Sequence, residues 1–161
     1  WNAYRAPGAW PDADMLPLGR LALGARDSAF TPAEQRTVMT LWAIARSPLI
    51  MGGDLRHLDR PTLDLLTNRA VLAVNQQSTD NQPHFIEDGM RAWTAKAPDG
   101  TSYVALFNMK DAARKVGFPL ARLGLGEASV TDLWSGEMLG RVAERVEAEL
   151  PPHGAALFRV G

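Results

Sequence analysis

The chain has 161 residues, of which 46% are hydrophobic and 22% charged, and a formal net charge of −1, as is typical of a soluble globular protein with a buried core. This charge offers no basic face for phosphate contacts, and no apolar run reaches the ~20 residues that cross a bilayer, so we expect neither nucleic acid nor a membrane as partner. Cysteine is absent and the three histidines lack metal-ligand spacing, so we expect no metal and no cofactor.

The chain begins at Trp1 and shows no charged segment followed by an apolar one, as a signal peptide would. We interpret it as a piece of a longer, soluble, bacterial protein. Its composition leaves open whether that protein is cytoplasmic or exported.

The first distinctive segment is Trp10–Leu16, WPDADML. In an extended chain Asp12 and Asp14 point to the same side, about 6.5 to 7 Å apart, a separation that suits the carboxylate pair of a glycosidase. The alternative is that one Asp accepts backbone N–H groups in an Asx-turn while the other faces solvent. Trp10 and Met15 could contact the apolar face of a sugar, although such residues more often belong to a core.

The next segment predicts a helix and then a strand. Thr31-Pro32-Ala33-Glu34 is a capping box with proline at the first helical position, and Ser47-Pro48 ends the helix. The apolar run Leu49–Met51, closed by two glycines, favours a buried parallel strand. Asp54 then follows the strand, where a carboxylate either serves an active site or caps the next helix. The helix has one apolar face, with Trp42 in the core: Val38, Leu41, Trp42 and Ala45.

A second helix is expected from the N-cap candidate Asp59 to about Asn68, with Leu63 and Leu66 turned inward. The short apolar segment Val71–Val74 follows it. The polar stretch after that, at residues 75–82, is the expected domain boundary, which divides the chain into 1–76 and 77–161. Because one buried strand cannot form a sheet alone, the remaining strands must come from residues outside this chain.

The second half predicts an antiparallel β-sandwich, because short β-type runs alternate with turn signals about every 8 to 12 residues. Gly140–Leu150 is ambiguous between helix and strand, and we assign it to strand. Trp93 and Trp134 could form a sugar-stacking pair, although such residues more often fill a sandwich core. The expected strands are Ala92–Lys96, Tyr103–Asn108, Val130–Leu133 and Ala155–Val160.

Several of these motifs, in this order, resemble the C-terminal part of family 27 glycoside hydrolases, the α-galactosidases or melibiases. The Trp-x-Asp-x-Asp-Met-Leu run is the most specific of them, and the likeness covers nearly the whole chain. The other motifs are Leu41-Trp42-Ala43-Ile44, Ser47-Pro48-Leu49, Gly53-Asp54-Leu55-Arg56, Leu66-Thr67-Asn68, Ala73-Val74-Asn75-Gln76, Asp132-Leu133-Trp134-Ser135-Gly136 and Pro152-His153-Gly154-Ala155.

The resemblance implies the C-terminal part of a (β/α)8 barrel, α/β in class, followed by an antiparallel β-sandwich domain. It implies a retaining enzyme that removes terminal α-linked galactose, with both catalytic aspartates upstream of this chain. It places a galactose contact on Asp14 and a pocket wall on Met15, with Trp10 beside them. Asp12 and Asp54 are then structural residues near the site, and the rest of the barrel is needed for activity.

Two other interpretations remain at this stage. The chain could serve as a non-catalytic carbohydrate-binding or structural module, or its enzyme could have a sister activity, α-N-acetylgalactosaminidase or β-L-arabinopyranosidase. A third hypothesis, from spacing alone, makes Asp12 and Asp14 the catalytic pair.

Overall fold

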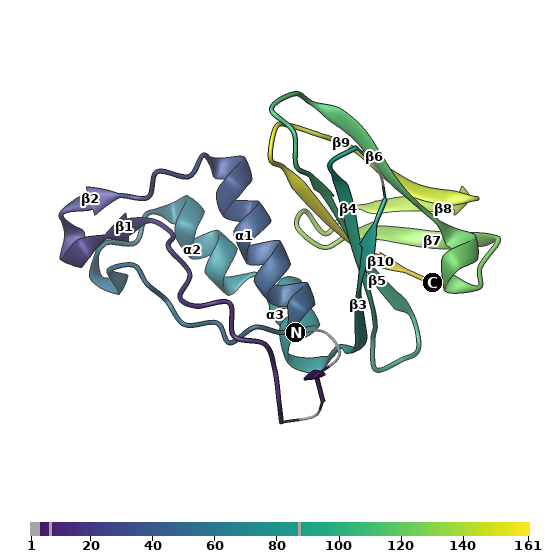
Figure 1. The fold of residues 1–161 in the computed structure, drawn as a ribbon, viewed down its shortest axis with the longest axis horizontal. Helices are drawn as coiled ribbons and strands as arrows, with labels where there is room; N and C mark the ends of the chain where they lie inside the picture. The colour runs from purple at the N-terminus through teal and green to yellow at the C-terminus, as the bar shows by residue number, and fades with distance from the viewer. Residues whose placement is uncertain (1–3, 7, 87) are drawn as a thin grey trace.

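The computed structural model describes residues 4–6, 8–86 and 88–161. The first half of the chain is mainly helical and the second half is made of antiparallel strands, with the helices packed against one face of the larger sheet (Figure 1). The elements of the first half are β1 (Arg20–Leu21), η2 (Ala22–Gly24), β2 (Arg26–Asp27), α1 (Pro32–Ala45), η3 (Leu55–His57), α2 (Arg60–Thr67) and α3 (Arg69–Gln77).

Helix α1 begins at the predicted capping box. The Thr31 hydroxyl accepts the Glu34 N–H at 3.3 Å, and the Glu34 carboxylate accepts the Thr31 N–H at 2.8 Å. Two N–H groups that have no partner within the helix are thereby satisfied. The helix ends at Ala45, because Arg46 is left-handed with φ 57°.

Helix α2 begins as predicted, since the Asp59 carboxylate accepts the Thr62 N–H at 2.8 Å. The inward orientation expected for Leu63 is wrong: Leu63 is exposed and Thr62 is buried in its place. The segment Val71–Val74, for which the sequence predicted no element type, lies within α3, which Asn68 caps.

The second half contains a six-stranded sheet in the order β3-β4-β5-β10-β7-β8 and a two-stranded sheet of β6 and β9. The four predicted strands correspond to β4, β5, β7 and β10. The sequence missed β6, and it also missed β3, which begins within the polar stretch taken as the boundary. The elements are β3 (Thr79–Phe85), β4 (Met90–Lys96), β5 (Ser102–Asn108), β6 (Arg114–Pro119), η4 (Leu120–Leu123), β7 (Glu127–Asp132), β8 (Met138–Ala143), β9 (Arg145–Leu150) and β10 (Ala155–Val160).

The ambiguous segment Gly140–Leu150 is strand, as predicted, but it belongs to two strands. Glu144 has a φ of 65° and separates β8 from β9, which lie in different sheets. Val142 therefore lies on a different strand from Val146 and Leu150.

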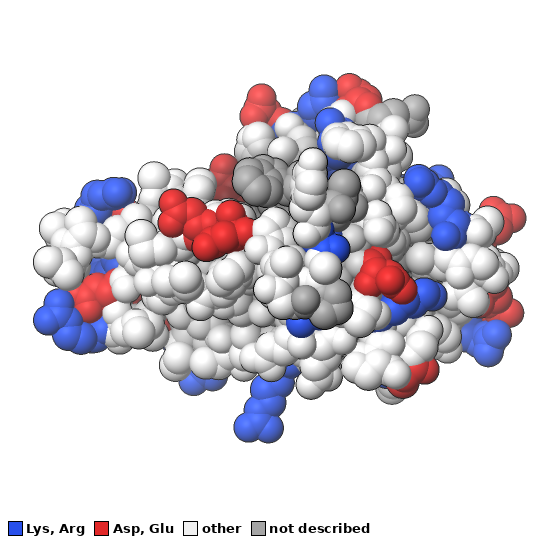
Figure 2. Space-filling view, turned by 60° about the horizontal axis from the view of Figure 1, so that its bottom comes forward, with Lys and Arg blue, Asp and Glu red and all other residues white. Residues whose placement is uncertain are grey.

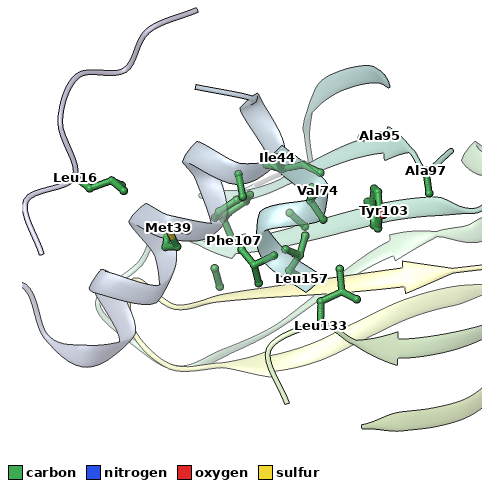
Figure 3. Packing of buried hydrophobic residues seen from close by; sticks show 14 of the residues in the cluster. Leu16, Met39, Ile44, Val74, Ala95, Ala97, Tyr103, Phe107, Leu133 and Leu157 are labelled. Atoms are coloured by element: carbon green, nitrogen blue, oxygen red, sulfur yellow. The ribbon is translucent and has the colours of Figure 1, made fainter. Parts of the chain in front are cut away.

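Two buried clusters lie on the two faces of the six-stranded sheet. One contains Phe118, Phe158 and their neighbours, all from the second half of the chain, and fills the space between the two sheets. The other combines both halves: Met39, Ile44 and Val74 from the helices meet Phe107 and Leu157 from the sheet (Figure 3). The molecule therefore has three layers, helices, sheet and sheet, and β5 in the middle layer is buried along its whole length.

The predicted buried strand Leu49–Met51 is wrong for this chain. Only one parallel bridge forms there among the described residues, between Leu16 and Met51, and the Leu16 N–H donates to the Ile50 carbonyl at 2.8 Å. Ile50 is 49% exposed. A parallel strand is normally covered on both faces and paired on both edges, and the described residues provide only Leu16 as a neighbour.

Candidate substrate-binding site

The segment Trp10–Leu16 does not have the extended geometry assumed for a carboxylate pair. Asp14 has a φ of 71°, in the left-handed region, and its N–H donates to the Asp12 carboxylate at 2.9 Å. Asp12 therefore forms the Asx-turn that was the alternative interpretation, and its carboxylate is committed to the backbone. The left-handed residue removes the premise that both carboxylates point to the same side of a strand.

Asp14 and Met15 lie together at one groove. Both side chains line a hollow of about 560 Å³ bounded by the start of the chain, the β1–β2 hairpin and α1. Met15 is 53% exposed. A Cβ atom added to Gly52 would lie only 3.0 Å from the Cβ atom of Met15, so the glycine makes room for the Met15 side chain. An exposed carboxylate beside an exposed thioether can hydrogen-bond the hydroxyls of a sugar and contact its apolar face.

Trp10 lies elsewhere. It lines a different hollow, of about 330 Å³, together with Tyr4, Arg5 and Asp12. The Arg46 guanidinium lies 3.8 Å from the centre of the Trp10 ring, so a cation–π contact already covers one face of the indole. The structure thus brings together Asp14 and Met15 of the predicted binding residues, and separates Trp10 from them.

Asp54 is enclosed by its own turn. Its carboxylate accepts the backbone N–H of Arg56 and two guanidinium N–H groups of the same residue at 2.8 to 3.0 Å, and the His57 Nδ1 lies 3.2 Å away. The side chain is 4% exposed. The hydrogen bonds from Arg56 hold the pKa of this carboxyl well below its usual range. Asp54 is therefore ionised and internally paired, and it caps η3.

Two further side chains that the sequence did not nominate form hydrogen bonds with the backbone of the segment Trp10–Leu16. The Trp42 indole N–H donates to the Asp14 carbonyl at 2.8 Å, and the Ser47 hydroxyl accepts the Ala13 N–H at 2.9 Å. The sequence predicted Trp42 as a core residue and Ser47 as a helix end, and both also lie in motifs that carry the resemblance. Nothing local in those motifs marks a contact with the distant segment.

Trp93 and Trp134 do not form an exposed stacking pair. Both pack against the cluster between helices and sheet. The Trp134 indole N–H donates to the Thr40 hydroxyl on α1 at 3.0 Å, and Arg5 lies over the Trp93 ring at 5.1 Å. A hollow of about 720 Å³ lies beside Trp134 between α1 and α2, on residues that do not include Asp14 or Met15.

The charges of the molecule are dispersed. Figure 2 shows acidic and basic side chains interspersed on one face, with wide uncharged areas between them. No helix in the described part of the chain combines the length and the apolar character needed to cross a membrane.

Two family models match the chain in succession. Residues 2–77 match the model described as Alpha galactosidase A, and residues 87–160 match the Alpha galactosidase C-terminal beta sandwich domain. These matches and the solved structures below confirm the predicted fold class, the end of a (β/α)8 barrel followed by an antiparallel β-sandwich.

Solved structures and curated proteins give the same picture. The chain is similar to a GH27 β-L-arabinopyranosidase from Geobacillus stearothermophilus, with 41% identity and a TM-score of 0.91 over 96% of this chain and 37% of that one. It is also similar to a putative α-N-acetylgalactosaminidase from Bacillus halodurans, with 38% identity and a TM-score of 0.90 over 96% and 38%. Alpha-galactosidase 2 from Arabidopsis thaliana is 29% identical over 98% of this chain and 39% of its own length. The chain thus spans less than two fifths of these relatives.

Proposed function

This chain belongs to glycoside hydrolase family 27, as its C-terminal part, and we propose that the whole protein is a retaining hydrolase that removes terminal α-linked galactose from galactosides. The observation that supports this proposal is the succession of the two family matches, one on each half of the chain. We also propose that residues 1–76 end the catalytic barrel and residues 77–161 form the closing domain.

In this proposal Asp14 accepts hydrogen bonds from sugar hydroxyls, and Met15 forms an apolar wall against the ring. The exposed position of both at one groove supports these roles. Trp10 lines a different hollow, and in this proposal it acts on the site through the segment that it shares with Asp14 and Met15. Asp12 braces the turn, and Asp54 fixes the chain after the Met51 bridge, so both are structural.

The covalent chemistry lies outside this chain in our proposal. Retention requires one carboxylate as nucleophile and a second as acid and then base, about 5 to 5.5 Å apart. The three nearby carboxylates already have partners within the chain: Asp12 and Asp14 accept backbone N–H groups, and Asp54 accepts Arg56. As the resemblance implies, both catalytic aspartates then belong to the preceding part of the barrel, and we expect the 161-residue chain alone to be inactive.

A second candidate activity is β-L-arabinopyranosidase, which the 41% identity to the Geobacillus enzyme favours. β-L-Arabinopyranose has the ring configuration of α-D-galactopyranose and lacks only its hydroxymethyl group, so Asp14 and Met15 could serve either sugar. The residues that read the 2-substituent, which distinguishes the α-N-acetylgalactosaminide from the other two sugars, belong in this proposal to strands outside this chain.

The test uses the full-length gene product and three nitrophenyl glycosides: α-D-galactoside, β-L-arabinopyranoside and α-N-acetylgalactosaminide. Release from the α-galactoside with the highest kcat/KM supports the first proposal. Preference for either of the other two glycosides replaces it with that sister activity, and no release from any of the three contradicts a glycosidase of this class.

The rival of a different class is a non-catalytic carbohydrate-binding module in the second half. The position of Trp93 and Trp134 against the helices argues against their use as a stacking platform. Calorimetric titration of residues 77–161 with galactosides tests the rival. A measurable heat of binding favours the carbohydrate-binding module, and no heat of binding favours a structural domain.

A further inference from the structure

The last turn of α1 and the two residues that follow the helix contact three positions of the segment Trp10–Leu16. Arg46 stacks on the Trp10 ring, Ser47 accepts the Ala13 N–H, and Trp42 donates to the Asp14 carbonyl. These contacts join the segment to a helix that lies about 30 residues further along the chain.

The backbone at the end of α1 makes this arrangement possible. Trp42 lies in the last turn of the helix, and the left-handed conformation of Arg46 ends the helix after Ala45 and places Ser47 beyond it. Few non-glycine residues adopt this conformation, and they keep it where surrounding contacts hold them. The contacts here are donations from Arg46 to the carbonyls of Gln76 at 3.0 Å and Ser78 at 2.5 Å.

A second layer of hydrogen bonds holds the turn itself. The Asn75 side-chain amide donates to the carbonyl of Trp42 at 3.3 Å and to that of Ser47 at 2.8 Å. Arg46 and Asn75 together tie the end of α1 to the end of α3, where the chain enters β3. The segment Trp10–Leu16 is therefore fixed to the junction of the two halves of the molecule.

We propose that Trp42, Arg46 and Ser47 are positioning residues of the substrate-binding site, which set the Asp14 carboxylate and Met15 at their groove. This inference rests on the proposed function of Asp14. It gives the junction with the β-sandwich a role in substrate binding, because the guanidinium that covers Trp10 also binds the carbonyl of Ser78 at the entrance to β3.

Trp42 has the most direct influence. Asp14 is left-handed, and its carboxylate accepts the N–H of Met15 at 2.6 Å, so this peptide is held at its N–H by Asp14 itself and at its carbonyl by Trp42. The indole N–H holds the Asp14 carbonyl from one side, and the Asp12 carboxylate holds the Asp14 N–H from the other. Loss of the indole donor frees the carbonyl and lets the Asp14 side chain leave its position.

The experiment uses the full-length enzyme and the substrate that it cleaves best. Trp42→Phe keeps the aromatic ring and removes the N–H, and we expect KM to rise about 3- to 10-fold, the value of one hydrogen bond, with kcat changed less than about twofold. The matched control is Trp134→Phe, which also removes an indole hydrogen bond to α1, at Thr40, but does not touch the segment. It should leave KM unchanged.

A double-mutant cycle separates positioning from general stability. If Trp42 acts through the Asp14 carboxylate, Trp42→Phe has little further effect on KM in an Asp14→Asn background. If the KM of the double variant rises by the product of the two single-variant increases, the inference is overturned. It is also overturned if Trp42→Phe and Trp134→Phe change KM equally. Ser47→Ala, which changes no aromatic packing, provides a second variant, and it too should raise KM and not kcat.

Failure of this inference is distinct from failure of the proposed function. An unmutated enzyme that cleaves none of the three glycosides contradicts the function. An enzyme that cleaves one of them and tolerates Trp42→Phe and Ser47→Ala without a rise in KM contradicts only the positioning role.

Discussion

On one face the six-stranded sheet packs against β6 and β9, and on the other it packs against α1 and α3. The cluster between the sheets is built from residues 92–160 alone, whereas the cluster under the helices needs residues from both halves of the chain. The second half therefore carries a core of its own, and the first half acquires one by docking on the sheet.

The first half is open in the sense that the only parallel bridge among the described residues, between Leu16 and Met51, has no further strand beside it. Large hydrophobic side chains are exposed in both halves: Met15 and Ile50, 53% and 49% exposed, in the first, and Phe85 and Met138, 75% and 83% exposed, in the second. The chain spans less than two fifths of its relatives, and its first half corresponds to the end of a barrel that the β-sandwich follows. Four predictions follow the comparison between the open half and the closed one.

The largest effect concerns catalysis. We expect the purified 161-residue chain to release no nitrophenol from any of the three glycosides at any pH, because we propose that both carboxylates that retention needs lie outside this chain. The full-length enzyme, assayed in parallel, is the control. Turnover by the isolated chain above the buffer blank would show that the chemistry is complete within these residues, and our division of the molecule would be wrong.

Two neighbouring residues of β10 compare the cores directly. Leu157 faces the helices and Phe158 faces β6 and β9, and both are buried. Leu157→Ala should lower the free energy of unfolding by about 2 to 5 kcal/mol and Phe158→Ala by about 3 to 5 kcal/mol. Urea denaturation measures both losses.

Hydrogen exchange distinguishes the two cores further, through the elements in which each variant speeds amide exchange. Leu157→Ala should speed amide exchange most in α1, where the docked helices open first, and Phe158→Ala should speed it throughout the sandwich. Equal changes in α1 and in β5 for both variants would indicate one cooperative unit, and the distinction between an independent core and a docked one would not hold.

A smaller effect is expected at the start of α1. Thr31→Ala removes the acceptor of the Glu34 N–H and should cost roughly 1 kcal/mol of stability, with faster exchange in the first turn of the helix. Glu34→Gln, which keeps an acceptor for the Thr31 N–H, is the matched control and should cost less. A larger loss from the control would mean that the charge of Glu34, and not the capping geometry, stabilises this helix end.

The same comparison explains which parts of the fold the sequence could predict. In the second half, apolar runs between turn signals were sufficient for β4, β5, β7 and β10, because these strands meet partners within the chain. β3 was missed because its polar residues make their contacts through tertiary structure: Asn81 is 3% exposed and donates to the Ile44 carbonyl and the Ser78 hydroxyl. Leu49–Met51 was predicted as a strand from its composition, and it lacks the neighbours that would complete one.

The candidate site was predictable only in part. The motif around Asp14 and Met15 is visible in the sequence, and the structure places both at one groove. The spacing of Asp12 and Asp14 suggested a carboxylate pair, but the left-handed φ of Asp14 could not be foreseen from residue types. The sequence did not assign Trp42 and Ser47 to the site, because their partners lie about 30 residues away in the chain. No local pattern marks a side chain that binds a distant carbonyl or N–H.

The smallest expected effect is on the pH dependence of stability, to which one group in each half contributes differently. In the second half, Arg122 donates to the His84 Nδ1 at 3.0 Å, which leaves Nε2 to donate to Thr94 at 2.8 Å in the neutral ring. Burial, and then the charge of Arg122, lower the pKa of His84. In the first half, the hydrogen bonds from Arg56 lower the pKa of Asp54.

A lowered pKa means that the unfolded chain binds more protons than the folded one, so each group stabilises the fold above its unfolded pKa and loses that contribution as pH falls. For His84 the loss begins below about pH 6.5, and for Asp54 only below about pH 4. His84→Gln, whose amide can keep both hydrogen bonds, should therefore flatten the decline in stability between neutral pH and pH 5, and Asp54→Asn should not. Urea midpoints across this range measure both, and an unchanged slope in His84→Gln would assign the decline to other groups.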